Sequence, residues 1–284
     1  MSLLEPTHSF ERPLPSLRET IDQASETLVC LDFDGTLAPI VDDPDRARIT
    51  QSNRRALEAL ASTPAVTTAV VSGRALSDVR SRVPVPVTCA GNHGLELYRE
   101  GSHSVHPIAK KRASTVEETC EALEDALERF PQCRVENKQL TGTVHVRSQR
   151  TRTRTRVHRI VHELVERIGG DALETSRGKR VLEISPAVPW GKGDAVALLE
   201  ESSPGDPFVL YVGDDVTDES AFRTVEPDGI GVHVGTDRPS VASCRVTSPS
   251  EVSSLLSWIA RARSTAATDE SVDTVAIASP AGLE

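Results

Sequence analysis

Residues 29–37 read Val-Cys-Leu-Asp-Phe-Asp-Gly-Thr-Leu, and the fold is interpreted outward from this stretch. It begins inside an apolar run whose length and residue types suit a buried strand. The run stops at two carboxylates, Asp32 and Asp34, which would be costly in the middle of such a strand. At the C-terminal end of a strand they are expected, because ligands of open α/β sheets bind there. Two adjacent carboxylates repel each other unless a cation lies between them, so the stretch predicts a metal-assisted site and not only an Asp-rich turn.

A second strand, expected over 65–71, ends at Ser72 and Gly73. A small hydroxyl beside a glycine, which allows close approach of the backbone, suits a phosphate oxygen. The alternative is that Ser72 only caps the helix expected over 75–83. Both roles are compatible, because a helix N-terminus attracts an anion.

Two later stretches add a cation and further carboxylates. Lys192 lies between two glycines at the start of a helix expected over 195–201, where its ammonium group and the helix dipole both attract an anion. Asp214 and Asp215 follow the strand expected over 208–212 and offer the hard oxygen ligands that Mg²⁺ prefers. Taken alone, they could form a capped turn before a helix.

The segment Asp32-Phe33-Asp34-Gly35-Thr36-Leu37 resembles the first motif of the haloacid-dehalogenase-like (HAD) phosphohydrolases. The resemblance implies that Asp32 is the nucleophile, which becomes an aspartyl phosphate, and that Asp34 is the general acid and base. It further implies a Mg²⁺ ion held by Asp32, by Asp34 through its backbone carbonyl, and by Asp214. By the same resemblance, the phosphate would be bound by Ser72, Gly73 and Lys192, and the metal site would be supported directly or through water by Asp215 and Asp218.

Three segments resemble the trehalose-phosphate phosphatases within this superfamily. Ser72-Gly73-Arg74 is similar to the SGR of sugar phosphatases, and residues 90–96 are similar to the family's AGxHGxE segment. Residues 213–222 match GDDxTDExxF, which is typical of that family. The resemblance implies that Arg74, Asn92 and His93 contact the substrate, whereas the residues alone would more simply let His93 satisfy loop backbone groups.

Between residues 104 and 184 the pattern changes to amphipathic helices, over 115–130 and 157–168, with a hairpin between them and a short strand at 180–184. This inserted α+β segment resembles the cap domain of sugar-phosphate members of the superfamily. A disaccharide requires polar side chains fixed on a sheet that faces the phosphate site. The candidates are Glu136, Lys138, His145, Arg147, Lys179 and Glu183.

Composition limits the class of partner. The chain has 284 residues and a formal net charge of −10, so general binding of nucleic acid is not expected. A run of arginines over 147–159 lacks interleaved aromatic residues that could stack on bases, and these arginines are expected to pair with glutamates. The five cysteines include no CxxC pair and are expected to be buried, reduced thiols. No apolar stretch is long enough to span a membrane, which favours the cytoplasm; the oligomeric state is left open.

The expected fold is α/β, with a doubly wound, mainly parallel Rossmann-like HAD core and an inserted α+β cap. The expected parts are an N-terminal arm (1–23), a catalytic core (24–103 and 185–263), the cap (104–184) and a disordered tail (264–284). A short helix in the arm, 16–25, is expected to begin with a capping box of Ser16 and Glu19.

The resemblance implies a magnesium-dependent phosphatase that hydrolyses trehalose 6-phosphate through an aspartyl phosphate. One alternative is another capped sugar phosphatase, acting on sucrose phosphate or mannosyl-phosphoglycerate. The other is a sugar-phosphate-binding regulator without catalytic activity, which the intact acidic residues and Lys192 argue against.

Overall fold

The computed structural model describes residues 8–9, 14–146, 151–178, 181–236 and 238–273. The chain forms two compact units. The first contains residues 1–71, 80–89 and the chain from Lys192 onward, and the second contains residues 72–79 and 90–191. The predicted cap segment, 104–184, lies within the second unit, and its action as a cap stays a prediction.

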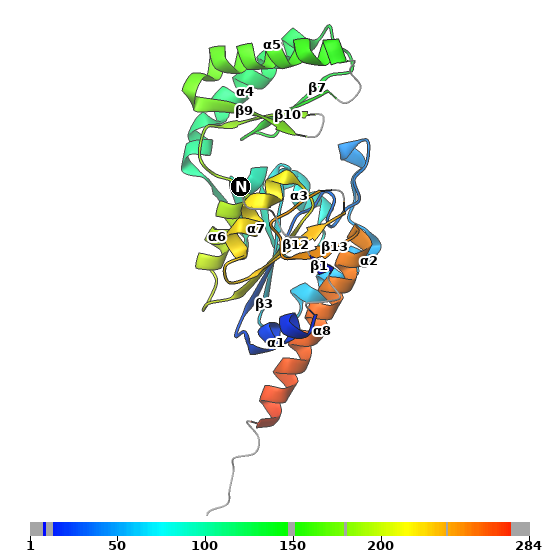
Figure 1. Ribbon diagram of the computed structural model, residues 1–284. Helices are drawn as coiled ribbons and strands as arrows, with labels where there is room; N and C mark the ends of the chain where they lie inside the picture. Colours follow the sequence, from blue (N-terminus) through cyan, green and yellow to red (C-terminus); the bar gives the residue numbers. More distant parts are fainter. Residues whose placement is uncertain (1–7, 10–13, 147–150, 179–180, 237, 274–284) are drawn as a thin grey trace, which may run out of the picture. The chain divides into compact units, whose positions relative to one another are not determined.

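The first unit is built on a parallel sheet (Figure 1). Its strands run in the order β1 (His8–Ser9), β13 (Cys244–Val246), β12 (Ile230–Val234), β11 (Phe208–Gly213), β2 (Thr27–Leu31) and β3 (Val66–Val71). Each pairs with its neighbours in parallel. From β2 the chain proceeds to β3 on one side, and it later returns to β11 on the other side. The order therefore reverses between β2 and β11, which is where ligands bind in doubly wound folds.

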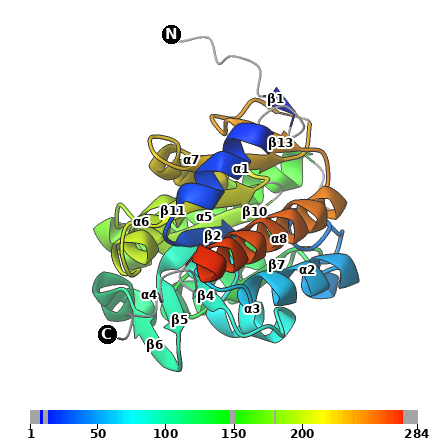
Figure 2. The same ribbon diagram turned by 90° about the horizontal axis from the view of Figure 1, so that it is seen from below.

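Helices cover both faces of this sheet. Figures 1 and 2 show α1 (Leu14–Gln23), α2 (Gln51–Ala61) and α8 (Pro249–Asp273) on one face, and α6 (Lys192–Glu201) and α7 (Glu219–Val225) on the other. Every residue of β2 is buried between them, which explains its continuous apolar sequence. Two elements, α3 (Leu76–Arg82) and β4 (Thr88–Gly91), have residues in both units.

The second unit begins with an antiparallel hairpin of β5 (Glu96–Arg99) and β6 (Ser102–Val105). It continues through α4 (Pro107–Leu127), β7 (Arg134–Asn137), β8 (Gly142–His145), α5 (Thr151–Gly169), β9 (Leu173–Gly178) and β10 (Val181–Pro186). The last four strands form an antiparallel sheet in the order β7-β8-β10-β9. Apolar side chains of α4 and α5 pack on one face of that sheet, around Val144, Leu182 and Ile184. The predicted fold class, a mainly parallel Rossmann-like core with an inserted α+β unit, is confirmed.

Local predictions differ from the structure at the N-terminus. The arm contains β1, which pairs with β13 at the edge of the sheet, and α1 begins at Leu14. Ser16 therefore lies inside α1, and the predicted capping box is wrong. Pro15, in the first turn, has the fixed φ that starts a helix, so the helix begins before the serine.

The predicted disordered tail also differs. Helix α8 extends to Asp273, so the expectation of disorder is wrong over 264–273. The hydroxyls of Ser264 and Thr265 donate to the carbonyls of Ala260 and Arg261, four residues earlier, so both residues satisfy their polar groups within the helix. Residues 274–284 lie outside the described residues.

Within the described residues, no helix has the length and apolar character needed to cross a membrane. All five cysteines are free thiols, and four of them are buried, with Cys133 half-buried. Among the arginines of the 147–159 run, Arg159 lies 3.9 Å from Glu163, and the guanidinium of Arg156 lies 5.8 Å from the centre of the Phe130 ring. The predicted pairing with glutamate is thus confirmed for Arg159.

The contact of α8 with α1 depends on Arg263, which is 7% exposed. Its guanidinium donates to the carbonyls of Ile21 (2.8 Å), Ala24 (2.6 Å) and Ser25 (3.0 Å), the acceptors left open at the end of α1. We expect Arg263→Met to lower the free energy of unfolding by about 2 kcal/mol or more, because it leaves these carbonyls without donors. Urea denaturation would measure the change.

The matched control is Arg261→Met, which removes an exposed arginine two residues away on the same helix. Its effect should stay within about 0.5 kcal/mol. Equal stabilities of the two variants would show that Arg263 does not hold α1.

Candidate functional site

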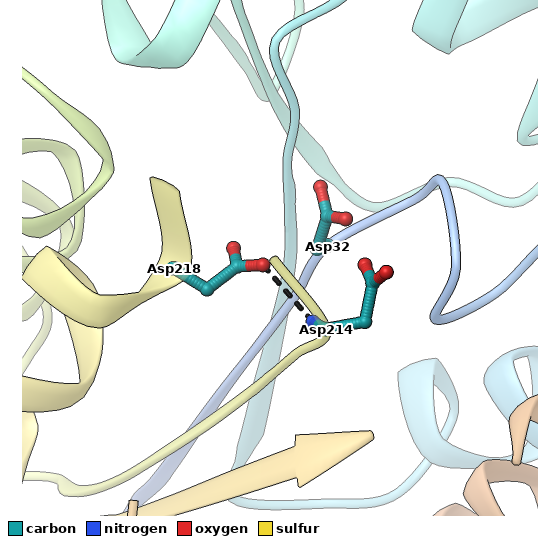
Figure 3. A group of neighbouring side chains, drawn as sticks. All are labelled: Asp32, Asp214 and Asp218. Atoms are coloured by element: carbon teal, nitrogen blue, oxygen red, sulfur yellow. Dashed lines mark hydrogen bonds between the residues drawn. The ribbon is translucent and has the colours of Figure 1, made fainter. Parts of the chain in front are cut away.

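Three carboxylates meet at the point where the strand order reverses. The backbone N–H of Asp32 donates to the carbonyl of Val212 (2.8 Å), which sets the end of β2 level with the end of β11. Figure 3 shows the resulting group of Asp32, Asp214 and Asp218. One oxygen from each lies within 4.8 Å of the others, a spacing that a single metal ion can bridge.

Two glycines make room for this group. Gly35 has a φ of +87°, and a Cβ atom there would collide with the carboxylate of Asp214. A Cβ atom on Gly213 would collide with the side chain of Asp218. The glycines of the DxDGT and GDD motifs are therefore required by close approach of a carboxylate to the backbone.

Lys192 places a buried cation among the carboxylates, as predicted. It is the first residue of α6 and is 3% exposed. Its Nζ lies 2.7 Å from Oδ1 of Asp32 and 2.8 Å from Oδ1 of Asp218. Lys192, a predicted phosphate-binding residue, is therefore in direct contact with Asp32, the predicted nucleophile.

The carboxylate of Asp218 is fully engaged within the protein. Besides Lys192, Oδ1 accepts a hydrogen bond from the hydroxyl of Tyr211 (2.6 Å). Oδ2 accepts from the backbone N–H groups of Asp214 (3.0 Å) and Asp215 (2.8 Å). Although burial alone would raise the pKa of Asp218, the charge and hydrogen bond of Lys192 outweigh it and hold that pKa below its usual value. Asp218 thus holds Lys192 and the turn in place and has little capacity left for a metal.

Asp214 has the opposite character. Its Oδ1 is buried and has no hydrogen-bond partner among the described residues. Burial, and then the charges of Asp32 and Asp218, raise the pKa of Asp214 to about 9. Burial also raises the pKa of Asp32 to about 7, against the opposing effect of Lys192. The buried, unpartnered oxygen of Asp214 lies beside Asp32, a second carboxylate with a raised pKa. This arrangement fits a divalent cation that prefers oxygen ligands, such as Mg²⁺.

The remaining residues of the two aspartate motifs lie around this group. Asp34 is half-buried at the start of a turn. In this turn the N–H of Gly35 donates to the carbonyl of Ala38 (2.8 Å). Asp215 points to Arg238, whose Nη1 lies 3.1 Å from its Oδ1. The metal contact predicted for the Asp34 carbonyl and the supporting role of Asp215 stay predictions.

Other predicted residues belong to the second unit. Ser72 is buried, and its Oγ accepts from the N–H of Arg74 (3.3 Å), whose guanidinium pairs with Asp78 (2.7 Å). A Cβ atom on Gly73 would collide with the ring of His93, which stands on a left-handed turn with φ of +58°. The structure therefore brings Gly73 and His93 together, as expected of two segments that serve one site.

Asn92, by contrast, is fully buried. Its Nδ2 donates to Glu96 (2.5 Å) and to the carbonyl of Lys138 (3.1 Å), and its Oδ1 accepts from Thr141 (2.5 Å). This geometry supports a role in fixing the turn before His93, in place of the predicted contact with substrate.

The predicted sugar-reading residues gather on the polar face of the antiparallel sheet. Nζ of Lys138 donates to the carbonyl of Gly73 (3.1 Å) and lies 3.5 Å from Oε2 of Glu183, which also accepts from Thr143 (2.7 Å). Glu136 and His145 form a second pair at 2.7 Å, and this hydrogen bond lowers the pKa of Glu136. Arg147 and Lys179 lie outside the described residues.

Sequence reasoning missed several residues that support the site. Tyr211 sits within an apolar strand, and its buried hydroxyl signals that a polar partner must be near. Thr143 gave no such signal, because its partner Glu183 is distant in sequence. The same holds for Arg238.

Comparison with known proteins shows a family match and related sequences. The family model described as trehalose-phosphatase matches residues 30–253. The trehalose-phosphate phosphatase of Mycobacterium ulcerans is 36% identical over 249 residues, which cover 84% of this chain and 62% of that protein. The chain thus spans somewhat less than two thirds of that curated relative.

Solved structures share the fold. The C-terminal domain of the C. albicans trehalose-6-phosphate phosphatase is 22% identical, with a TM-score of 0.74 over 90% of this chain and 98% of that one. The C-terminal domain of the Candida albicans trehalose synthase regulatory protein is 14% identical, with a TM-score of 0.64 over 85% of this chain and 97% of that one. At these identities the likeness concerns the fold alone.

The raised pKa values predict how metal binding depends on pH. Near neutral pH the metal-free site holds a proton on Asp214, and this proton must leave before a cation can bind. Mg²⁺ affinity should therefore rise between about pH 6 and about pH 9, by up to about tenfold per pH unit for each proton displaced. Over this pH range the folded, metal-free protein holds protons that the unfolded chain has already released. The free energy of unfolding of the metal-free protein should therefore fall as pH rises.

Calorimetric titration with Mg²⁺ at several pH values would measure the slope. The control variant Asp228→Asn, which changes an exposed carboxylate in the turn between α7 and β12, should keep the same slope. An affinity that does not change with pH would contradict the protonated state of Asp214.

Proposed function

Because the chain belongs to the trehalose-phosphatase family, we propose that it is a magnesium-dependent phosphatase that hydrolyses trehalose 6-phosphate to trehalose and phosphate. The observation that carries the proposal is the contact of Lys192 with Asp32 (2.7 Å) beside the unpartnered carboxylate of Asp214. A carboxylate that attacks a phosphate ester needs positive charge beside it. Lys192 supplies one cation here, and the grouped carboxylates offer oxygen ligands for a second.

In the first step, Asp32 uses a carboxylate oxygen to form a bond to phosphorus. The bond from phosphorus to the sugar oxygen breaks, and Asp34 gives its proton to the departing alkoxide. Lys192 stabilises the charge on the phosphoryl oxygens, with Ser72 and Gly73 proposed as hydrogen-bond donors to the same group. Trehalose leaves, and phosphate remains on Asp32 as an acyl phosphate.

In the second step, Asp34, now a carboxylate, takes a proton from a water molecule. The water oxygen bonds to phosphorus, and the bond from phosphorus to Asp32 breaks. Inorganic phosphate leaves, and both aspartates return to their starting states.

The side chains of Asp32 and Asp214 and the backbone carbonyl of Asp34 would hold Mg²⁺. When bound, this ion screens the negative charges of the phosphate and of the carboxylate that attacks it. Asp218 and Asp215 support the arrangement through Lys192 and through the turn that carries Asp214.

Recognition of the sugar is assigned to the polar face of the antiparallel sheet. Lys138, Glu183 and the Glu136–His145 pair present donors and acceptors held by mutual hydrogen bonds, which suits a polyhydroxylated ligand. Arg74, His93, Arg147 and Lys179 complete the proposed set. The free cysteines support a reducing compartment, the cytoplasm.

The first test compares substrates and metals. Phosphate release should be fast with trehalose 6-phosphate and Mg²⁺, slower by about tenfold or more with sucrose 6-phosphate or glucose 6-phosphate, and abolished by EDTA. If phosphate were released in a metal-dependent way only from another substrate, the phosphatase activity would be supported and the proposed specificity for trehalose 6-phosphate would be refuted. Binding of trehalose 6-phosphate without phosphate release from any substrate would favour the regulator.

The second test separates the two aspartates of the first motif. Asp32→Asn should reduce turnover by about 10⁴-fold or more, because an amide cannot serve as the nucleophile. Asp34→Asn should reduce the overall rate by about 10²-fold to 10⁴-fold and, with a good leaving group such as p-nitrophenolate, let labelled phosphate accumulate on Asp32. Asp42→Asn, a change in a nearby acidic loop residue, is the control; normal turnover by Asp32→Asn would refute the mechanism.

A further inference from the structure

A pocket lies in the first unit, lined by residues that take no part in the carboxylate group. Its volume is about 440 Å³. The lining side chains come from the segment before α2, from the first turn of α2, and from the end of α3 and the residues after it. They are Arg48, Ile49, Gln51, Arg54, Ser81, Arg82 and Pro84. Three of these described residues are arginines and none is acidic, in a chain whose net charge is −10.

Two of the arginines converge on the same backbone oxygens. Nη1 of Arg48 donates to the carbonyls of Asp45 (2.7 Å) and Ala47 (2.8 Å). Nη1 of Arg82 donates to the same carbonyls, at 3.2 Å and 2.6 Å. The two guanidinium groups are thereby fixed close together, an arrangement of like charges that favours an anion between or beside them.

The third arginine extends the basic wall along the helix. Arg54 lies in the first turn of α2, a helix of 11 residues that begins at Gln51. Its Nε pairs with Glu58 one turn later (2.8 Å), where both side chains are partly exposed. Such a surface pair is weak, so the guanidinium can turn to a ligand at little cost. The positive end of the helix dipole points to the same place.

We propose that this pocket binds a phosphate monoester of a small metabolite. Arginine forks match the geometry of phosphate oxygens. The lining side chains include three arginines and no acidic residue, which favours a dianion, while Glu58, the partner of Arg54, is not among them. The volume exceeds that of phosphate alone and falls in the range of small-molecule sites. The side chains of Ile49 and Pro84 provide an apolar wall for the organic part.

The test follows backbone amide signals of metal-free, ¹⁵N-labelled protein by NMR, so that no turnover intervenes. Inorganic phosphate and glucose 6-phosphate are the two probes. Saturable shifts are expected at Gln51 and Ser81, independently of any shifts near Asp214. Tighter binding of glucose 6-phosphate would assign the organic part to the pocket, and equal binding would assign phosphate alone.

Three variants of α2 are expected to change the affinity of the pocket in three different ways. Arg54→Gln should weaken binding at the pocket by about tenfold, the loss of one charge-assisted hydrogen bond. Glu58→Gln should strengthen it a few-fold, because it frees Arg54 from its carboxylate. Arg55→Gln removes an exposed arginine that does not line the pocket and should leave binding unchanged.

Two results would overturn the proposal. One is equal affinity of the Arg54→Gln and Arg55→Gln proteins, since removal of any single positive charge would then act alike. The other is a response to both probes that is confined to amides near Asp214, which would assign anion binding to the acidic site alone.

Discussion

The buried ammonium of Lys192, held between Asp32 and Asp218, is the interaction on which the arrangement of the site depends. Three carboxylates drawn together at the end of a sheet repel one another, and water is largely excluded from them. Lys192 contacts Asp218 and Asp32 but not Asp214, so the carboxyl of Asp214 keeps a raised pKa and an oxygen without a hydrogen-bond partner among the described residues. A divalent cation would bind at this oxygen once the proton of Asp214 has left.

The sequence was sufficient to predict that Asp32 and Asp214 converge, because each follows a strongly apolar strand and parallel strands bring their ends together. Lys192 begins a helix, and it was expected at the same site from its flanking glycines and from the resemblance. The sequence was not sufficient for contacts made by side chains from distant segments. The environment of Asn92 depends on Thr141 and on the carbonyl of Lys138, and only the folded chain brings these to Asn92. The sequence analysis missed the short strands β6 and β13 and the extension of α8 into the predicted tail. These segments lack a clear periodic pattern.

The fold does not by itself distinguish a phosphatase from a binding protein. Similar structures include both a trehalose-6-phosphate phosphatase domain and a domain of a trehalose synthase regulatory protein. What separates the two possibilities is the chemistry of individual groups. The contact of Asp32 with a lysine, beside an unpartnered carboxylate, is the observation that supports the proposed phosphatase.

Helix α2 is tied to the backbone of the first motif through Asn53. This buried side chain donates to the carbonyls of Thr36 (3.3 Å) and Leu37 (2.9 Å), while the N–H of Thr50 donates to the latter (3.2 Å). The same helical turn forms a wall of the arginine-lined pocket. One rigid element therefore borders two separate sites, and any energetic coupling between them obeys reciprocity: the factor by which an occupant of one site alters affinity at the other acts equally in both directions.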